Sequence, residues 1–262
     1  MTASNAVFYL AFIMDSSNIF PSRKRLFLIT FAYFCLFVIF TIISTIIANS
    51  SISLLRLVFQ KTNYLALQPS DDSYYLLALF FQEVMLLLTA WLCLRFSIQN
   101  KQFFEESSLE KSRIILYGFA GAVLAFGISV LLSYLTQIFY GKLNDPVIQS
   151  FQSFSLTHKI LFASLGSFVA PICEEIFFRR ALFGIFRQYN YINSGIAFSS
   201  ILFTLLHFSS FSRMGVFYFI AILVAGIILA IVYNKTNSIL TSIITHILVN
   251  TISFLLYFYW FT

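Results

Sequence analysis

The residues best suited to chemistry are a few ionisable and amide side chains inside long apolar stretches. Glu174 and Glu175 are adjacent, and Arg179 follows Glu175 by four residues. Further along the chain, His246 and Asn250 are also four residues apart. Residues with this spacing share one face of a helix. Ionisable side chains in such a setting are suited to proton transfer, so the pattern indicates general acid–base chemistry.

A further pair, Phe203 and His207, has the same four-residue spacing. Glu175 can pair with Arg179 on one helix face, whereas Glu174 is rotated by about 100° and faces another sector. One carboxylate is thus neutralised within its own helix and the other is left over. A carboxyl group held away from water can exchange its proton near neutral pH, which general acid–base catalysis requires.

The overall composition places these motifs in a membrane. Of the 262 residues, 60% are hydrophobic and only 10% are charged, against about 25% charged in soluble domains. The mean hydropathy is +0.88. Too little polar surface remains to cover a water-facing globule, and three cysteines are too few for a disulfide scaffold. We therefore expect an all-α, polytopic transmembrane bundle.

Apolar runs long enough to cross about 30 Å of hydrocarbon predict about seven membrane helices, of which the fifth is the shortest. Helices are expected because lipid-exposed backbone must satisfy its own hydrogen bonds, and the runs are too long for barrel strands. We expect one membrane domain over residues 1–262, with N-terminal spans in 26–139 and the motif region in 160–261. Interfacial segments are expected at 6–14 and 52–67. The predicted spans are 26–48, 74–98, 114–139, 160–186, 195–211, 215–233 and 239–261.

The basic residues predict the orientation of the chain. With a cytosolic N-terminus, most of the 16 Lys and Arg residues fall on the inner side, which obeys the positive-inside rule. The net charge of +6 thus indicates topology, and no nucleic-acid partner is expected. We expect a multi-pass protein of the cell (plasma) membrane, of bacterial type, with the lipid bilayer as its surroundings. The outer side receives only Arg56, Lys61, Lys142, Lys159 and Arg213.

Depth in the membrane gives an independent reason to group the motifs. At a rise of 1.5 Å per residue, His207, His246 and Asn250 lie about 18, 10 and 16 Å from the inner ends of their spans. Glu174 lies about 20 Å from the inner end of its span, or about 8 Å if Arg179 marks the interface. All four groups can therefore meet in the inner half of the bilayer, in one buried polar chamber.

One more carboxyl group, that of Glu83 beside Gln82, lies inside the second predicted span. Ionisable residues within a span are costly and mark functional sites or buried partners. Glu83 can be a proton carrier, a partner for a buried basic side chain, or part of the wall of the site, and the sequence leaves these alternatives open.

The ordered motifs Glu-Glu-x-x-x-Arg, Phe-x-x-x-His and His-x-x-x-Asn resemble those of an intramembrane protease family. This is the CPBP or Abi family, which comprises CAAX proteases and bacteriocin-processing enzymes. The resemblance covers residues 160–261 and implies an all-helical fold with a membrane-embedded site near the cytosolic face. It also implies cleavage of a peptide bond in a peptide or membrane-protein substrate. One departure is that Arg180 and Ala181 follow the motif Arg179, where family members often have Gly.

The resemblance also implies roles for the motif residues. Glu174 and His207 would activate the water, and His246 with Asn250 would hold the carbonyl oxygen. The implied supporting residues are Glu175, Arg179 and Phe203. We expect this chemistry to need no cofactor. A zinc-dependent, metalloprotease-like alternative stays open, in which the ligands would be Glu174, His207 and His246.

Two other classes of function use the same features. A non-catalytic membrane scaffold, such as a bacteriocin self-immunity protein, could keep this fold only to bind a partner. A proton-coupled transporter also uses buried Glu and His residues. The transporter is disfavoured because the sequence has no internal repeat and no matching pair of broken helices.

Overall fold

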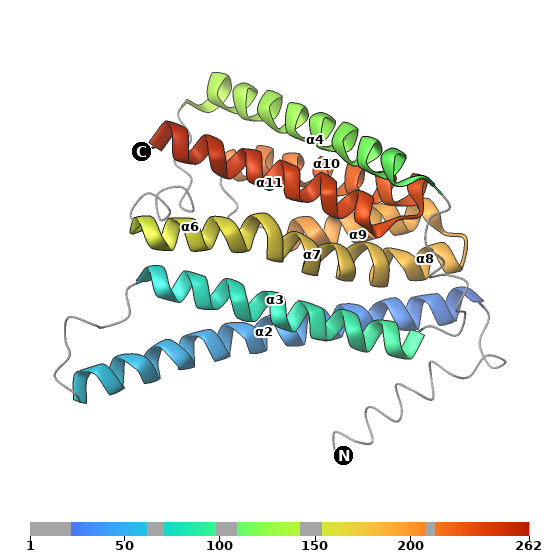
Figure 1. Ribbon diagram of the computed structural model, residues 1–262. Coiled ribbons are helices and arrows are strands. Elements are labelled where there is room, and N and C mark those ends of the chain that lie inside the picture. Colours follow the sequence, from blue (N-terminus) through green and yellow to red (C-terminus); the bar gives the residue numbers. More distant parts are fainter. Residues whose placement is uncertain (1–21, 62–70, 98–108, 142–153, 208–212, 262) are drawn as a thin grey trace, which may run out of the picture.

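The computed structural model describes residues 22–61, 71–97, 109–141, 154–207 and 213–261 (Figure 1). Within these ranges the regular structure is helical and includes no strand. Six helices are long and apolar enough to cross a membrane, and one shorter apolar helix accompanies them. The predicted polytopic helical bundle is therefore confirmed. The predicted interfacial segment at 6–14 lies outside the described residues.

The described chain begins with three long helices, continues with one interrupted helix and ends with three more. The fourth segment runs without a break from residue 156 to 188 but changes between α-helical and π-helical geometry. The elements are α2 (Ser22–Lys61), α3 (Asp71–Ser97), α4 (Lys111–Tyr140), α6 (Leu156–Ser164), η3 (Leu165–Val169), α7 (Ala170–Glu175), η4 (Ile176–Phe183), α8 (Gly184–Gln188), α9 (Ile192–Leu206), α10 (Arg213–Thr236) and α11 (Ile239–Phe261).

Helix α2 is longer than the sequence analysis predicted. It continues for 40 residues and takes in the first part of the predicted surface segment at 52–67. The prediction of a separate element there was wrong, because residues 22–61 contain no Gly or Pro that would end the helix. The polar run around residue 50 does not break it either, since the Ser53 hydroxyl donates to the Asn49 carbonyl of its own helix, at 2.8 Å.

The fourth span is interrupted by two π-helical segments that flank the carboxylate pair. Pro171 lies at the start of α7, directly after η3. Proline lacks an N–H, and its ring collides with the preceding turn of a regular α-helix. The wider turn of η3 accommodates it, and the Ala170 N–H donates to the Leu165 carbonyl five residues back. Such π-helical turns often occur at functional sites, and here α7, with Glu174 and Glu175, lies between two of them.

The fifth apolar helix is short, as predicted. Helix α9 has 15 residues and is therefore about 22 Å long, less than the thickness of the hydrocarbon layer. His207 follows its last residue and caps its C-terminus. A helix that ends before it has crossed the membrane can place the residue at its end inside the protein.

The helices form three layers in Figure 1. Helices α2 and α3 pack together on one side, and α4 packs against α10 and α11 on the other. The continuous segment from α6 to α8 lies between these two groups, with α9 beside it. The central layer therefore contacts both outer layers and contributes many of the buried core residues.

Small residues and buried hydroxyl groups bring the layers close together. The Thr245 hydroxyl of α11 donates to the Gly118 carbonyl of α4, at 2.9 Å. A Cβ atom at Gly195 would lie only 2.5 Å from the Phe186 side chain, so a glycine is needed where α9 meets α8. Between α2 and α3, the Tyr33 hydroxyl donates to the Cys93 carbonyl at 2.6 Å. Such small-residue contacts and interhelical hydrogen bonds are typical of membrane bundles.

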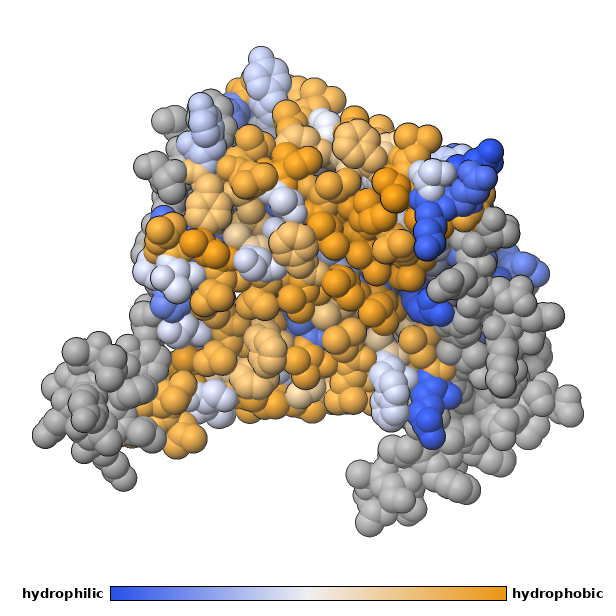
Figure 2. Space-filling model, in the orientation of Figure 1, coloured by the Kyte–Doolittle hydropathy of each residue, from blue (hydrophilic) through white to orange (hydrophobic). Residues whose placement is uncertain are grey.

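The outer surface is suited to lipid. Large apolar side chains are freely exposed along the helices, for example Phe27, Leu116 and Tyr259. Figure 2 shows hydrophobic residues over the middle of the visible face and strongly hydrophilic ones gathered at its right-hand edge. At that edge α2 begins, α3 ends and α4 begins. Such a broad apolar surface is typical of a multi-pass membrane protein.

Candidate active site

The carboxylate of Glu174 lies between two imidazole rings from two other helical segments. Its Oε1 atom is 3.8 Å from Nε2 of His207, at the end of α9. Its Oε2 atom is 3.7 Å from Nε2 of His246, in α11. Glu174 and His246 are buried, whereas the His207 side chain is 29% exposed. The site is therefore closed around the carboxylate and partly open beside His207.

His207 is oriented by the turn that ends α9. Its Nδ1 atom lies 2.9 Å from the Phe203 carbonyl oxygen, four residues back. A carbonyl oxygen only accepts, so Nδ1 must carry the hydrogen and the Nε2 atom of a neutral His207 carries a lone pair. That lone pair faces Glu174. The gap of 3.8 Å exceeds a direct hydrogen bond and is of the size that a bridging water can span.

Glu175 is engaged on both sides. Its Oε1 atom accepts from Nδ1 of His246 at 3.1 Å, and its Oε2 atom lies 3.2 Å from Nε of Arg179. Both Glu175 and Arg179 are fully buried. Nη2 of Arg179 also donates to the Gly226 carbonyl of α10, at 3.3 Å. The predicted pair on one helix face is thus also a link to α10 and α11.

The two ring nitrogens of His246 face two different carboxyl groups, those of Glu174 and Glu175. Carboxylates only accept hydrogen bonds, so an imidazolium, with a hydrogen on each nitrogen, fits both neighbours. Arg179 balances the charge of Glu175 directly, which avoids the large penalty of an unpaired ion in an apolar interior.

Phe203 packs at the centre of the basic groups. Its ring centroid lies 4.6 Å from that of His207 and 5.5 Å from that of His246. The guanidinium carbon of Arg179 lies 4.6 Å from the same centroid, within the range of a cation–π interaction. One aromatic side chain therefore restricts the positions of three polar ones.

Asn250 has a different position from the other motif residues. Its Nδ2 atom donates to the Gly166 carbonyl of η3, at 2.8 Å. Since a side-chain amide has two donor hydrogens, one stays available to another acceptor. The structure thus brings Glu174, His207 and His246 into one group, surrounded by Glu175, Arg179 and Phe203, and attaches Asn250 to the backbone at its border.

A metal ion would need three or more of these side chains to point at one place. In the part of the chain that the structure describes, no group of three His, Cys, Asp or Glu side chains is placed to hold one. The two histidines approach different oxygens of Glu174. The contact between His246 and Glu175 is nevertheless of the kind that orients a metal-binding histidine, so the zinc alternative stays a prediction.

Sequence reasoning did not foresee several groups around the site. The carbonyl groups of Gly226 and Gly166 accept from Arg179 and Asn250, and no sequence signal marks a backbone acceptor. Glu83, in contrast, could be found from the sequence, because it is an ionisable residue within an apolar span. It is buried in α3 and interacts electrostatically with Glu174.

The fold and the site together define a polytopic helical membrane protein with a buried group of carboxyl and imidazole side chains. Residues 156–252 match the model of a family that is described as type II CAAX prenyl endopeptidase Rce1-like. This match confirms the resemblance predicted from the motifs and covers every predicted site residue. It supports an intramembrane protease of the CAAX type at the level of the family. Comparison with curated proteins and with solved structures gave no match.

The buried ion pair leads to a prediction about stability. We expect Arg179→Met to lower the free energy of unfolding by about 3–5 kcal/mol, because Glu175 would keep its charge without the guanidinium. Adding Glu175→Gln in a double variant should recover much of this loss, since neither buried charge then remains. Thermal unfolding of the purified protein in detergent measures both effects.

The matched control is Arg113→Met, because Arg113 is an exposed residue in the first turn of α4. We expect it to change the stability little. An Arg179→Met variant as stable as this control would show that the buried pair does not stabilise the bundle.

Proposed function

We propose that the protein is an intramembrane endopeptidase that hydrolyses a peptide bond in a membrane-associated or leader-peptide substrate. The observation that supports this most directly is the Glu174 carboxylate, which faces two imidazole rings in a buried site. The Rce1-like match over the same residues supports the same class of reaction.

In the proposed mechanism a water molecule lies between Glu174 and the Nε2 atom of His207. Glu174 takes a proton from this water as its oxygen attacks the carbonyl carbon of the peptide. The tetrahedral intermediate then collapses, the carbon–nitrogen bond breaks, and the leaving amine takes the proton back from Glu174. The gap of 3.8 Å between the two side chains suits this shared water.

The negative charge on the peptide oxygen needs donors in the same site. A hydrogen on Nε2 of His246 and the second amide hydrogen of Asn250 are the donors that we assign to it. Glu175, which accepts from Nδ1 of His246, sets the orientation of that ring. Arg179 and Phe203 fix Glu175 and the two histidines by the contacts described above.

Substitution of the water-activating residues tests the proposal. We expect Glu174→Gln and His207→Gln to lower the rate of cleavage by about 10²- to 10⁴-fold, which is the usual contribution of general acid–base catalysis. The measurement compares peptide termini in the membrane proteomes of cells that express the wild type or Glu174→Gln. A peptide terminus that is found with the wild type and is missing with Glu174→Gln identifies the substrate.

His158→Gln is the control for that comparison, since His158 of α6 bonds to Ser155 and lies outside the site. It should leave the same termini in place. If Glu174→Gln and His207→Gln accumulate normally and change neither the termini nor the cellular phenotype, the protein is a non-catalytic scaffold or a bacteriocin self-immunity protein instead.

The proposed chemistry uses no metal, and metal analysis tests this separately. We expect purified protein at neutral pH to contain no stoichiometric zinc and to keep its activity after treatment with a chelator. One tightly bound zinc per chain, with activity that is lost on its removal and restored by its return, would assign Glu174, His207 and His246 as zinc ligands.

We also propose that the N-terminus is cytosolic, that the membrane is the plasma membrane of a bacterial cell, and that the site opens toward the cytosol. Basic residues at the ends of helices support this orientation, with Lys111 at the start of α4, Arg187 in α8 and Lys235 in the last turn of α10.

Labelling of single cysteines tests the orientation. In a chain whose native cysteines are replaced by alanine, we expect a membrane-impermeant thiol reagent to label Thr157→Cys on intact cells. Lys235→Cys should react only after the membrane is opened. Both positions are exposed and lie at opposite ends of the bundle, at the start of α6 and the end of α10. The opposite labelling pattern would reverse the topology.

A further inference from the structure

Glu83 is a buried carboxyl group that the proposed mechanism does not use. It lies in α3, and only 2% of the residue is exposed. By strict hydrogen-bond geometry neither of its carboxyl oxygens has a partner among the described residues, although the side chains of Cys173 and Gln82 act on the carboxyl group as donors. Helix α3 packs directly against α7, and the Glu83 carboxyl interacts with Glu174 and with the Cys173 thiol of that helix.

The orphaned oxygens of Glu83 have a counterpart on Glu174. The Oε2 atom of Glu174 is also buried and lacks a hydrogen-bond partner among the described residues, since His246 lies 3.7 Å from it. Oε2 of Glu175 and Nε and Nη1 of Arg179 lack such a partner as well, but these two side chains face each other, with Nε and Oε2 3.2 Å apart. Buried polar atoms are nearly always paired, so the carboxyl groups of Glu83 and Glu174 still need an explanation. Two carboxyl groups that share one proton give each other a partner.

The charges around Glu83 favour its protonated form. In the described part of the chain no Arg, Lys or His forms an ion pair with it. A second buried negative charge beside Glu174 would be opposed both by desolvation and by repulsion.

Most of the remaining titratable side chains of the elements packed against α3 are occupied elsewhere. Among those that the structure describes at α2, α6, α7 and η4, Tyr33 bonds to the Cys93 carbonyl and His158 bonds to Ser155. Glu175 and Arg179 pair with each other, and Arg180 acts on Tyr233. Cys35 and Lys159, which are only partly buried, are the other described titratable side chains of these elements. Glu83 therefore keeps its proton while Glu174 is ionised, and a protonated acid is a hydrogen-bond donor.

Resting on the proposed function, we propose that Glu83 is a positioning residue: its protonated carboxyl group donates to the Glu174 carboxylate, directly or through one water, and holds it toward the two histidines. Glu83 keeps its own proton during the reaction. The pair holds one proton at rest, gains a second from the attacking water and returns one to the leaving amine. Loss of the Glu83 proton at alkaline pH would remove the donor and add a negative charge beside the developing oxyanion, so the rate should fall.

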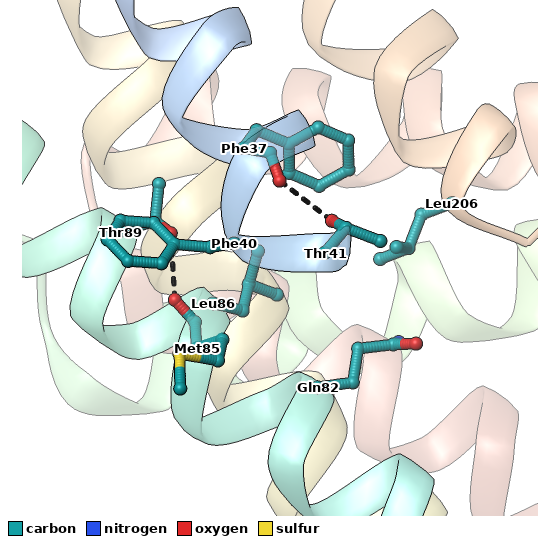
Figure 3. Close-up of a pocket in the computed structure, with 8 residues that line it drawn as sticks. All are labelled: Phe37, Phe40, Thr41, Gln82, Met85, Leu86, Thr89 and Leu206. Atoms are coloured by element: carbon teal, nitrogen blue, oxygen red, sulfur yellow. Dashed lines mark hydrogen bonds between the residues drawn. The ribbon is translucent and has the colours of Figure 1, made fainter. Parts of the chain in front are cut away.

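A small hollow lies near this pair. Gln82, the neighbour of Glu83, lines it together with side chains of α2 and with Leu206, the residue before His207 (Figure 3). It encloses no more than a water-sized space. Figure 3 shows Gln82 and Leu206 among the residues that line it. The hollow thus connects the helix that carries Glu83 with the end of α9.

Infrared spectroscopy of the full-length protein tests the protonation of Glu83 without any assay of activity. At neutral pH we expect the difference spectrum of wild type and Glu83→Gln to contain the carbonyl band of a protonated carboxylic acid. The band should persist but shift in Glu174→Gln, which alters its acceptor. Glu110→Gln is the control, because Glu110 is an exposed carboxylate and its removal should change only carboxylate bands. A Glu83 that contributes a carboxylate band at neutral pH would overturn the inference.

The rate of cleavage as a function of pH tests the role of the proton. For a peptide that spans the bond cut by the wild type, Glu83→Gln keeps an N–H donor, so kcat/KM at neutral pH should stay within about tenfold of the wild type. Because glutamine cannot ionise, the fall in rate at alkaline pH should move to higher pH or vanish. Glu83→Met has no donor and should lower kcat/KM by about 10- to 100-fold at neutral pH.

The outcomes separate this inference from the proposed function. If Glu174→Gln cleaves as well as the wild type, the proposed protease function fails, while the infrared band still decides whether Glu83 is protonated. If Glu174 is required but Glu83→Gln and Glu83→Met both keep the rate and pH profile of the wild type, Glu83 has no positioning role. Elution of each variant as a single symmetrical species in detergent shows that it is folded.

Discussion

The arrangement of the whole site follows from one constraint, the burial of two adjacent carboxyl groups inside an apolar bundle. Neither Glu174 nor Glu175 reaches water, so each needs partners from the protein. One short stretch of helix cannot supply them all, because consecutive side chains point in different directions. The partners therefore come from α9, α10, α11 and the next turn of the same segment. The central position of α7, in contact with both outer layers, makes this possible.

The same constraint explains the irregular features near the site. Helix α9 ends inside the bundle at His207, whose ring is then oriented by the Phe203 carbonyl of the last turn. The fourth segment changes to π-helical geometry on both sides of the carboxylates, which redirects the side chains that follow, including Arg179. Such local departures from a regular helix cost stability and are common where function requires a particular geometry. Away from the site, α4 and α10 are regular from end to end.

Much of this structure could be predicted from the sequence, because hydrophobic length and side-chain spacing are local properties. The spans, the short fifth helix and the pairing of Glu175 with Arg179 follow from them. The extension of α2 was missed because a few polar residues were taken to end a helix that contains no Gly or Pro. The partners of Asn250 and Arg179 on backbone carbonyls could not be foreseen, since they depend on how separate helices pack. The position of Glu83 beside Glu174 depends on the same packing.

The difference between the two adjacent glutamates is a matter of partners and not of sequence. Glu175 has a guanidinium 3.2 Å from one oxygen, as an ion pair, and an imidazole N–H bonded to the other. Glu174 has nitrogen atoms at 3.7 and 3.8 Å, too far for direct hydrogen bonds, and stays free to accept a proton. A carboxylate that forms an ion pair with a guanidinium is a weaker base than one without a close cation in the same apolar setting. Exchange of the two roles would require His246 to turn its ring and Arg179 to leave its place on Phe203. Contacts of the Phe203 ring with Arg179 of η4 and His246 of α11 therefore determine which carboxylate can act as the base in the proposed reaction.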